Sequence, residues 1–146
     1  MTTQPVILVV DDDEDDRLFI QLAFEENDDL NYPLAFATDG YKALEWLTNA
    51  SELPVLVLLD INMPRLNGLE VLKKLRDSPK WRGLPVIMFT TSGEANAIAK
   101  AYDLGANSYV TKPPTYSDFG TLLRTVCHYW LEVAHVPGYE RQRAAV

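Results

Sequence analysis

The stretch VILVVDDDEDDR, residues 6–17, joins an apolar segment directly to a run of acids. Five consecutive apolar residues are typical of a strand that is covered on both faces of a parallel sheet. Five Asp and one Glu fill the next six positions, before an arginine. A solvated first helical turn accounts for Asp13 to Asp16, because acids interact favourably with the start of a helix. It does not account for Asp11 and Asp12, which follow the strand directly.

A calcium loop of the EF-hand type is an alternative interpretation of the acids at positions 11, 13 and 15. Such a loop needs Gly at its sixth position and Glu at its twelfth. Asp16 and Leu22 stand there instead, and a strand precedes the acids where an EF-hand has a helix. The sequence therefore disfavours a calcium loop.

Four more strand-like segments follow along the chain, and segments with a helical period separate them. The four are PLAFA (33–37), VLVLLD (55–60), VIMFTT (86–91) and SYVT (108–111). We expect Gly105 to end the fourth helix and Ser117 to cap the last helix, which runs to Val133. The alternation predicts an α/β fold, a doubly wound five-stranded parallel sheet with five helices and a flavodoxin-like topology. We expect one domain over residues 1–134 and a short, partly disordered C-terminal extension over residues 135–146.

The composition narrows the classes of partner. The chain has 146 residues, a net charge of -8 and a single cysteine, Cys127. The negative charge repels phosphate backbones and anionic membrane surfaces, so we expect neither nucleic-acid binding nor membrane insertion. No basic signal region precedes the first apolar segment, and no apolar segment approaches the roughly 20 residues that span a bilayer. We therefore expect a cytoplasmic protein.

Polar residues gather where the predicted strands end. The set comprises Asp11, Asp12, Asp60, Thr90, Thr91 and Lys112. The carboxyl ends of parallel strands meet at one edge of the sheet, where such folds bind ligands. Three neighbouring carboxylates require a compensating cation, and Mg²⁺ combines carboxylates with phosphate oxygens. The set therefore predicts a magnesium site that handles a phosphoryl group, with one carboxylate as nucleophile and the lysine neutralising charge.

Four motifs, VVDDD, LLDINMPRLNG, VIMFTTS and SYVTKP, stand in this order at the predicted strand ends. Together they resemble the receiver domain of two-component response regulators, over roughly residues 5–133. Three features are similar to the free-standing regulators that serve bacterial phytochrome-type kinases. These are the extended connection after the first helix, the WRGLPV segment before the fourth strand and the long last helix.

The resemblance implies a role for each site residue. Asp60 would be the phosphoacceptor, taking the phosphoryl group from a phosphohistidine of a sensor histidine kinase or a histidine phosphotransfer protein. Asp12 would bind Mg²⁺ directly, Asp11 would bind it mainly through water, and Asn62 would offer its backbone carbonyl. Lys112 would pair with a phosphoryl oxygen.

The resemblance also implies a switch. Thr90 would move its hydroxyl toward the phosphoryl group, with Thr91 next to it as the alternative, and Tyr109 would rotate inward with that move. Core packing is the other interpretation of Tyr109. The family further implies a cis Lys112–Pro113 bond. Pro64 and Gly68 would shape the loop beside Asp60.

The function expected from these residues is that of a stand-alone regulator, which accepts a phosphoryl group and switches a protein-binding face without being an enzyme. One alternative is a magnesium-dependent phosphatase with an aspartyl nucleophile, but Asn62 stands where such enzymes carry a second Asp. Another is a binding module with the receiver fold that works without phosphorylation. A flavodoxin-like cofactor binder would leave the acids and the lysine without a role.

Little sequence follows the last helix, so we expect the output to be protein contact or transfer of the phosphoryl group to another protein. The candidate surface combines the fourth helix, the fifth strand and the last helix. Tyr129 and Leu131 lie outside the expected core stripe of that helix and would contribute to the surface. A homodimer through this face is a further expectation.

Overall fold

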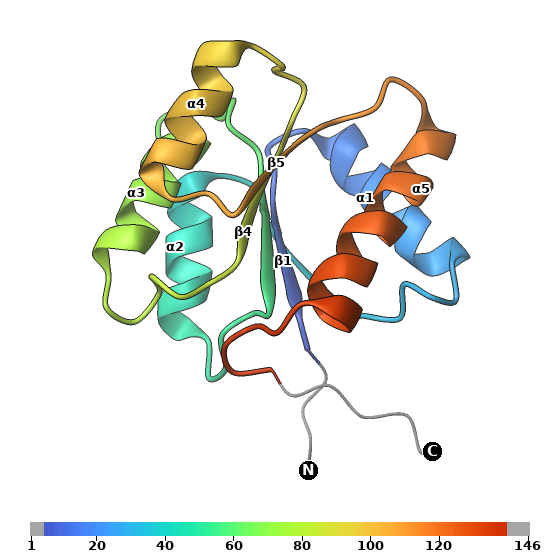
Figure 1. The fold of residues 1–146 in the computed structure, drawn as a ribbon, viewed down its shortest axis with the longest axis horizontal. Helices are drawn as coiled ribbons and strands as arrows, with labels where there is room; N and C mark the ends of the chain where they lie inside the picture. The colour runs from blue at the N-terminus through green and yellow to red at the C-terminus, as the bar shows by residue number, and fades with distance from the viewer. Residues whose placement is uncertain (1–4, 140–146) are drawn as a thin grey trace.

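A computed structural model of the protein describes residues 5–139 and contains one sheet of five parallel strands (Figure 1). The strand order is β2-β1-β3-β4-β5. The strands are β1 (Ile7–Val10), β2 (Leu34–Ala37), β3 (Leu56–Leu59), β4 (Val86–Thr90) and β5 (Ser108–Thr111). Each lies within the segment predicted from the sequence, and the parallel sheet is confirmed.

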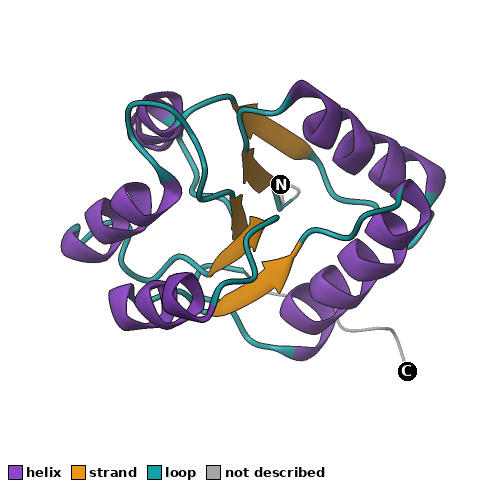
Figure 2. Cartoon of the chain, turned by 90° about the horizontal axis from the view of Figure 1, so that it is seen from above, coloured by secondary structure: helices purple, strands orange, loops and turns teal. Residues whose placement is uncertain are grey.

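Helices cover both faces of the sheet, as the doubly wound prediction requires (Figures 1 and 2). They are α1 (Glu14–Glu26), α2 (Gly40–Asn49), α3 (Gly68–Asp77), α4 (Ala95–Leu104) and α5 (Tyr116–Cys127), followed by the π-helix η1 (His128–Val133). Helices α2, α3 and α4 pack on one face, whereas α1, α5 and η1 pack on the other.

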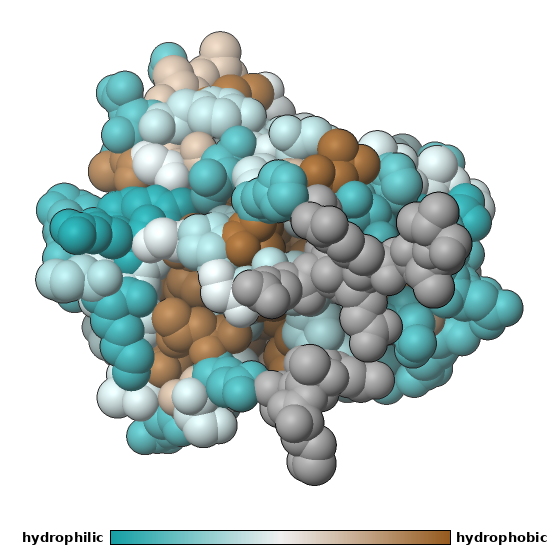
Figure 3. All heavy atoms as spheres, turned by 60° about the horizontal axis from the view of Figure 1, so that its bottom comes forward, coloured by the Kyte–Doolittle hydropathy of each residue, from teal (hydrophilic) through white to brown (hydrophobic). Residues whose placement is uncertain are grey.

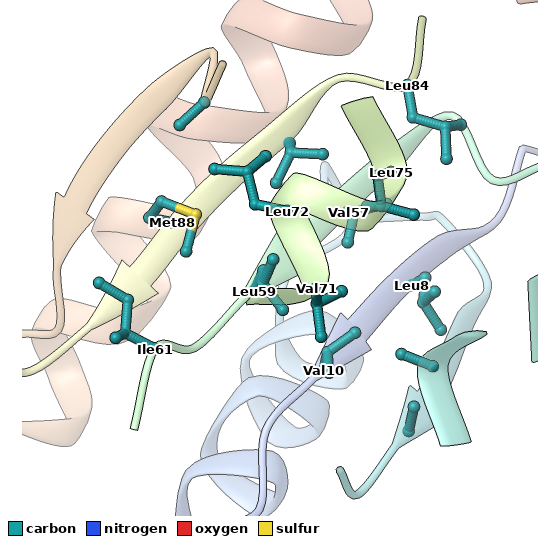
Figure 4. Packing of buried hydrophobic residues seen from close by; sticks show 14 of the residues in the cluster. Leu8, Val10, Val57, Leu59, Ile61, Val71, Leu72, Leu75, Leu84 and Met88 are labelled. Carbon is teal, nitrogen blue, oxygen red and sulfur yellow. The ribbon is translucent and has the colours of Figure 1, made fainter. Parts of the chain in front are cut away.

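The two cores follow from the alternation of side chains along each strand. Leu8 and Val10 of β1 face α2 and α3, and Ile7 and Val9 face α1 and α5. All four are buried, which is why the strand is apolar at every position. Figure 4 shows the first core, in which side chains of α3 lie among those of β1, β3 and β4.

The end of the last helix differs from the prediction. The helix begins after Thr115 instead of Ser117, and its final six residues form the π-helix η1. A π turn holds more residues than an α turn, so it shifts the faces of the residues that follow. Leu131 is consequently buried, although we expected it on the surface, whereas Val133 is 52% exposed. Tyr129 is exposed, as expected.

Gly105 ends α4 in the left-handed conformation, with a φ of 106°, and confirms the predicted cap. Arg76 at the end of α3 anchors the adjoining loops. Its guanidinium donates hydrogen bonds to the carbonyls of Gly105, Arg82 and Leu84 and to the Asn107 side chain. Asn107 Oδ1 also accepts from the backbone N–H of Val86, at the start of β4.

The predicted extension over residues 135–146 is described only as far as Tyr139, where a turn brings Val136 and Tyr139 into an isolated bridge. Residues 140–146, and with them much of the expected disorder, lie outside the described residues. The boundary at residue 134 stays a prediction. None of the described helices is both long enough and apolar enough to cross a membrane.

Candidate functional site

Three carboxylates meet at the carboxyl edge of the sheet. Asp11 and Asp12 follow β1, and Asp60 follows the adjacent strand β3. One oxygen from each lies within 4.8 Å of the others. Asp11 and Asp60 are buried, and Asp12 is exposed at the mouth of the site. Carboxylate oxygens are hard ligands of the kind that Mg²⁺ and Mn²⁺ prefer, so this donor set fits such a cation.

Lys112, which follows β5, reaches into the same cluster. Its Nζ lies 2.6 Å from Asp11 Oδ2, 2.7 Å from Asp16 Oδ2 and 3.3 Å from Asp60 Oδ2. Burial alone would lower the pKa of this ammonium, but the hydrogen bonds to Asp11 and Asp16 outweigh burial and raise the pKa above its ordinary value. Lys112 is therefore a permanent cation beside the carboxylate of Asp60.

The site remains short of positive charge. Desolvation raises the pKa of Asp11 from 3.8 to about 6, and the hydrogen bond and charge of Lys112 compensate only in part. The ammonium of Lys112 is paired with the carboxylates of Asp11, Asp16 and Asp60, and the carboxylate of Asp12 lies beside those of Asp11 and Asp60. A divalent cation among these oxygens would stabilise the ionised form of every one of them.

The rest of the acidic run has a structural role. Asp13 is the N-cap of α1, and its Oδ1 accepts hydrogen bonds from the backbone N–H groups of Asp15 and Asp16. The backbone N–H of Asp13 in turn donates to Asp11 Oδ1 at 2.9 Å. Arg17 donates to the backbone carbonyl of Asp11 at 2.7 Å. The first helical turn therefore fixes the position of Asp11, and the predicted solvated helix start is confirmed for the exposed Asp13, Glu14 and Asp15.

The structure distinguishes the two candidate hydroxyls. Thr90 is completely buried at the end of β4, and Thr91 is exposed. Tyr109 of β5 is half-buried, and its hydroxyl donates to the backbone carbonyl of Ser92 at 2.6 Å. Tyr109 therefore ties β5 to the loop between β4 and α4. It also packs against the core, in keeping with the alternative interpretation.

The loop after Asp60 is held close to α3. A Cβ added to Gly68 would lie 2.0 Å from the backbone oxygen of Asp60, so only glycine fits at the start of this helix. Asn62 and Pro64 are exposed in the same loop.

The expected cis Lys112–Pro113 bond is not found, since no peptide bond among residues 5–139 is cis. For an X–Pro bond the two isomers differ by only about 0.5–1 kcal/mol, so the motif alone does not determine which one forms.

Two acids in this region were not predicted individually. Asp16 was assigned only to the solvated helix start, but its carboxylate contacts Lys112. Asp39 follows β2 and is buried, and it caps α2 by accepting from the backbone N–H of Lys42. It also pairs with Arg65 at 2.8 Å. The hydrogen bond from Lys42 is the main cause of the lowered pKa of Asp39. The Asp-Gly pair before a helical segment signals this cap, whereas nothing local signals the contact between Asp16 and Lys112.

A surface groove of about 730 Å³ lies elsewhere, along β2 and α2, and its lining includes Phe36 and Trp46. None of the acids in the carboxylate cluster, and neither Thr90 nor Lys112, lines it. Apolar side chains also gather on the face of the molecule shown in Figure 3. The acid–lysine cluster, with its titratable groups in contact, is the better candidate for chemistry.

The fold and its acid–lysine edge define the protein as a receiver domain. Residues 7–124 match the family described as the response regulator receiver domain, and the chain belongs to this family. Receiver domains accept phosphoryl groups from histidine kinases in two-component signalling and bind Mg²⁺ or Mn²⁺ at an acidic pocket.

Three comparisons show where in the family the similarity lies. The chain is 30% identical to the response regulator Rcp1 of Synechocystis over 137 residues, which cover 90% of this chain and 92% of Rcp1. The crystal structure of the phosphorylated cyanobacterial phytochrome response regulator RcpA has a TM-score of 0.86 at 31% identity, covering 93% of this chain and 100% of RcpA. The Mn²⁺-bound form of Rcp1 has a TM-score of 0.82 at 29% identity, covering 92% and 99%. The predicted similarity to regulators associated with phytochromes is confirmed.

Proposed function

We propose that this protein is a stand-alone response regulator whose phosphoacceptor is Asp60. The observation that carries the proposal is the convergence of Asp11, Asp12 and Asp60 within 4.8 Å, with Lys112 bonded to two of them. Neighbouring carboxylates of this kind hold a hard cation, and a carboxylate beside a fixed ammonium can act as a nucleophile toward phosphorus. The phosphoryl donor would be the phosphohistidine of a sensor histidine kinase or of a phosphotransfer protein.

In the proposed reaction, a carboxylate oxygen of Asp60 attacks the phosphorus of the donor. The new O–P bond forms as the N–P bond breaks, and the departing imidazole nitrogen keeps the bonding electron pair. Mg²⁺, held by Asp11, Asp12, Asp60 and the backbone carbonyl of Asn62, would neutralise phosphoryl charge. Lys112 donates a hydrogen bond to a phosphoryl oxygen and stabilises charge that is spread over the transferring group.

Two residues would carry the response. Thr90 is buried at the carboxyl end of β4, where it pairs with Thr111 of β5. From there its hydroxyl can turn toward a phosphoryl group on Asp60. The loop between β4 and α4 would follow that turn, and the hydrogen bond from Tyr109 to Ser92 O would transmit the motion to β5. A ligand shifts such an equilibrium only through contacts that differ between the two states, and Thr90 would supply one.

The output would be a change in the surface formed by α4, β5 and α5. Tyr102 of α4 is about half exposed and lies on this side of the molecule, where its hydroxyl accepts a hydrogen bond from the backbone N–H of Tyr109. We propose a cytoplasmic protein that uses this surface for a partner or for a homodimer. Light scattering with and without beryllofluoride tests the dimer, and a monomer under both conditions would refute it.

The decisive experiment is intact mass spectrometry after incubation with acetyl phosphate. We expect one phosphoryl adduct on the wild type with Mg²⁺, no adduct with EDTA, and no adduct on Asp60→Asn. Retention of the adduct in Asp60→Asn would disprove the assignment of the nucleophile. If no adduct forms and beryllofluoride causes no spectral change, the protein would instead be a binding module that works without phosphorylation. Rapid multiple turnover of small phosphate esters would favour the phosphatase alternative.

A further inference from the structure

The buried ammonium of Lys112 has three hydrogen-bond donors, and each has a carboxylate within reach. Two of the carboxylates, from Asp11 and Asp60, belong to the proposed metal cluster. The third belongs to Asp16 in the first turn of α1 and lies outside that cluster. We infer that Asp16 is a positioning residue, which holds and orients Lys112 for phosphoryl transfer to Asp60. This inference rests on the proposed function.

The contact with Asp16 is short and sheltered. Nζ of Lys112 lies 2.7 Å from Asp16 Oδ2, which is closer than its 3.3 Å distance to Asp60. The lysine side chain is only 3% exposed and that of Asp16 19% exposed, so water screens the pair weakly. Most charge pairs on a protein surface lack this geometry and contribute little. This pair therefore fixes the lysine more firmly than an ordinary surface contact would.

The backbone of the first turn of α1 holds Asp16 in position to contact Lys112. The N-cap Asp13 accepts the backbone N–H of Asp16 at 3.2 Å and so fixes the first helical turn. The carboxylate then extends from a rigid helix toward Lys112, which follows the edge strand β5 and lies 96 positions later in the chain. A charged partner on a rigid element orients a group more accurately than one on a free loop.

The other two partners of Lys112 take on further bonds during the proposed reaction. A cation among the cluster oxygens draws on the negative charge of Asp11 and Asp60, and an acyl phosphate on Asp60 leaves no carboxylate there. Asp16 is then the one carboxylate bonded to the ammonium that neither belongs to the proposed metal cluster nor carries the phosphoryl group. A buried charge without a partner is costly, so losing Asp16 would let Lys112 turn toward water or toward Asp11. With Asp16 in place, one N–H of the ammonium stays directed at the phosphoryl group.

The plain alternative is that Asp16 only stabilises the start of α1, as acids in the first turn do. Asp15 provides a matched control for that effect. It lies in the same turn, carries the same charge and also donates its backbone N–H to Asp13. Its side chain is exposed, and it forms no ion pair with Lys112. A general charge or helix effect would therefore appear equally in Asp15→Asn and in Asp16→Asn.

The experiment compares Asp16→Asn, Asp16→Ala and Asp15→Asn with the wild type in two measurements. The first is the ¹H–¹⁵N NMR signal of the Lys112 ammonium in the metal-free protein, assigned by its loss in Lys112→Met. The second is the rate of adduct formation from acetyl phosphate at saturating Mg²⁺. We expect Asp15→Asn to match the wild type in both. We expect Asp16→Asn to shift the signal, to speed its hydrogen exchange and to slow phosphorylation by about tenfold, with a larger loss in Asp16→Ala.

Equal behaviour of Asp16→Asn and Asp15→Asn would overturn the inference. A shifted ammonium signal with an unchanged phosphorylation rate would also overturn it, because the contact would then orient nothing that the reaction uses. If Asp16→Ala does not fold, Asp16→Asn, which has nearly the same shape, still decides the question. Failure of the wild type to form any adduct would instead refute the proposed function, and the metal-free NMR signal would separate this outcome from the others.

Discussion

The raised pKa of Asp11 predicts how the stability of the metal-free protein varies with pH. A carboxyl group whose pKa is higher in the folded state binds more protons there, so stability falls as the pH rises between the two pKa values. For Asp11 these values are 3.8 in the unfolded chain and about 6 in the folded protein. The difference corresponds to about 3 kcal/mol, at about 1.36 kcal/mol for each pKa unit. This cost is absent below about pH 4 and complete above the folded pKa of about 6.

The perturbation is Asp11→Asn, which removes the titrating carboxyl group. The assay is urea unfolding in EDTA between pH 4 and 7.5, followed by tryptophan fluorescence. We expect the free energy of unfolding of the variant to gain about 3 kcal/mol relative to the wild type from the lowest to the highest pH. Asp12→Asn, which removes an exposed carboxylate from the same cluster, is the control and should show a much smaller change.

A difference between Asp11→Asn and the wild type that does not vary with pH would refute the reasoning. It would mean that Lys112 compensates fully for the burial of Asp11. A difference of the opposite sign would mean that the ion pair dominates desolvation.

At pH 7.5, Mg²⁺ at 100 times its dissociation constant should stabilise the wild type by about 2.7 kcal/mol. The same concentration should stabilise Asp11→Asn less.

Three further predictions concern the packing and hydrogen bonds of the fold. Arg76→Ala should lower the free energy of unfolding by about 3 kcal/mol in urea melts, because four acceptors lose their donor. Gly68→Ala should destabilise the protein by at least about 1–3 kcal/mol and slow adduct formation, since its Cβ meets the backbone of Asp60. Gly83→Ala, which meets no atom within 4 Å, should do neither. Leu131→Ala should cost about 2–5 kcal/mol and Val133→Ala less than about 0.5 kcal/mol, and equal costs would contradict the π-helical register.

The sheet and the acid–lysine edge were predictable because their signals are local. Five apolar segments gave the strands, and the residue types at their ends gave the cluster of Asp11, Asp12, Asp60 and Lys112. The parallel topology then brings these residues together, because the carboxyl ends of parallel strands lie at one edge of the sheet. Thr90 is the last residue of β4, in which every residue is buried, whereas the exposed Thr91 lies beyond the end of the strand.

The features that were missed depend on long-range geometry or on small energy differences. The contact between Asp16 and Lys112 joins residues 96 positions apart, and no local pattern encodes it. The π-helix over His128–Val133 moved Leu131 into the core, although its sequence fits an α-helix equally well. The role of Arg76 depends on acceptors in two separate loops, one before β4 and one before β5. The Lys112–Pro113 bond has two isomers that are close in energy.

The three ion pairs of Lys112 also bear on how the protein folds. They span 101, 96 and 52 positions of the chain, and Lys112 follows β5, the last strand in the chain. Contacts between residues so distant in sequence form slowly, because the chain must first close long loops. The ammonium reaches Asp60 only after β5 has docked on β4. A nascent or partly unfolded chain would thus carry the carboxylates without their lysine, so phosphorylation would report only on molecules that have finished folding.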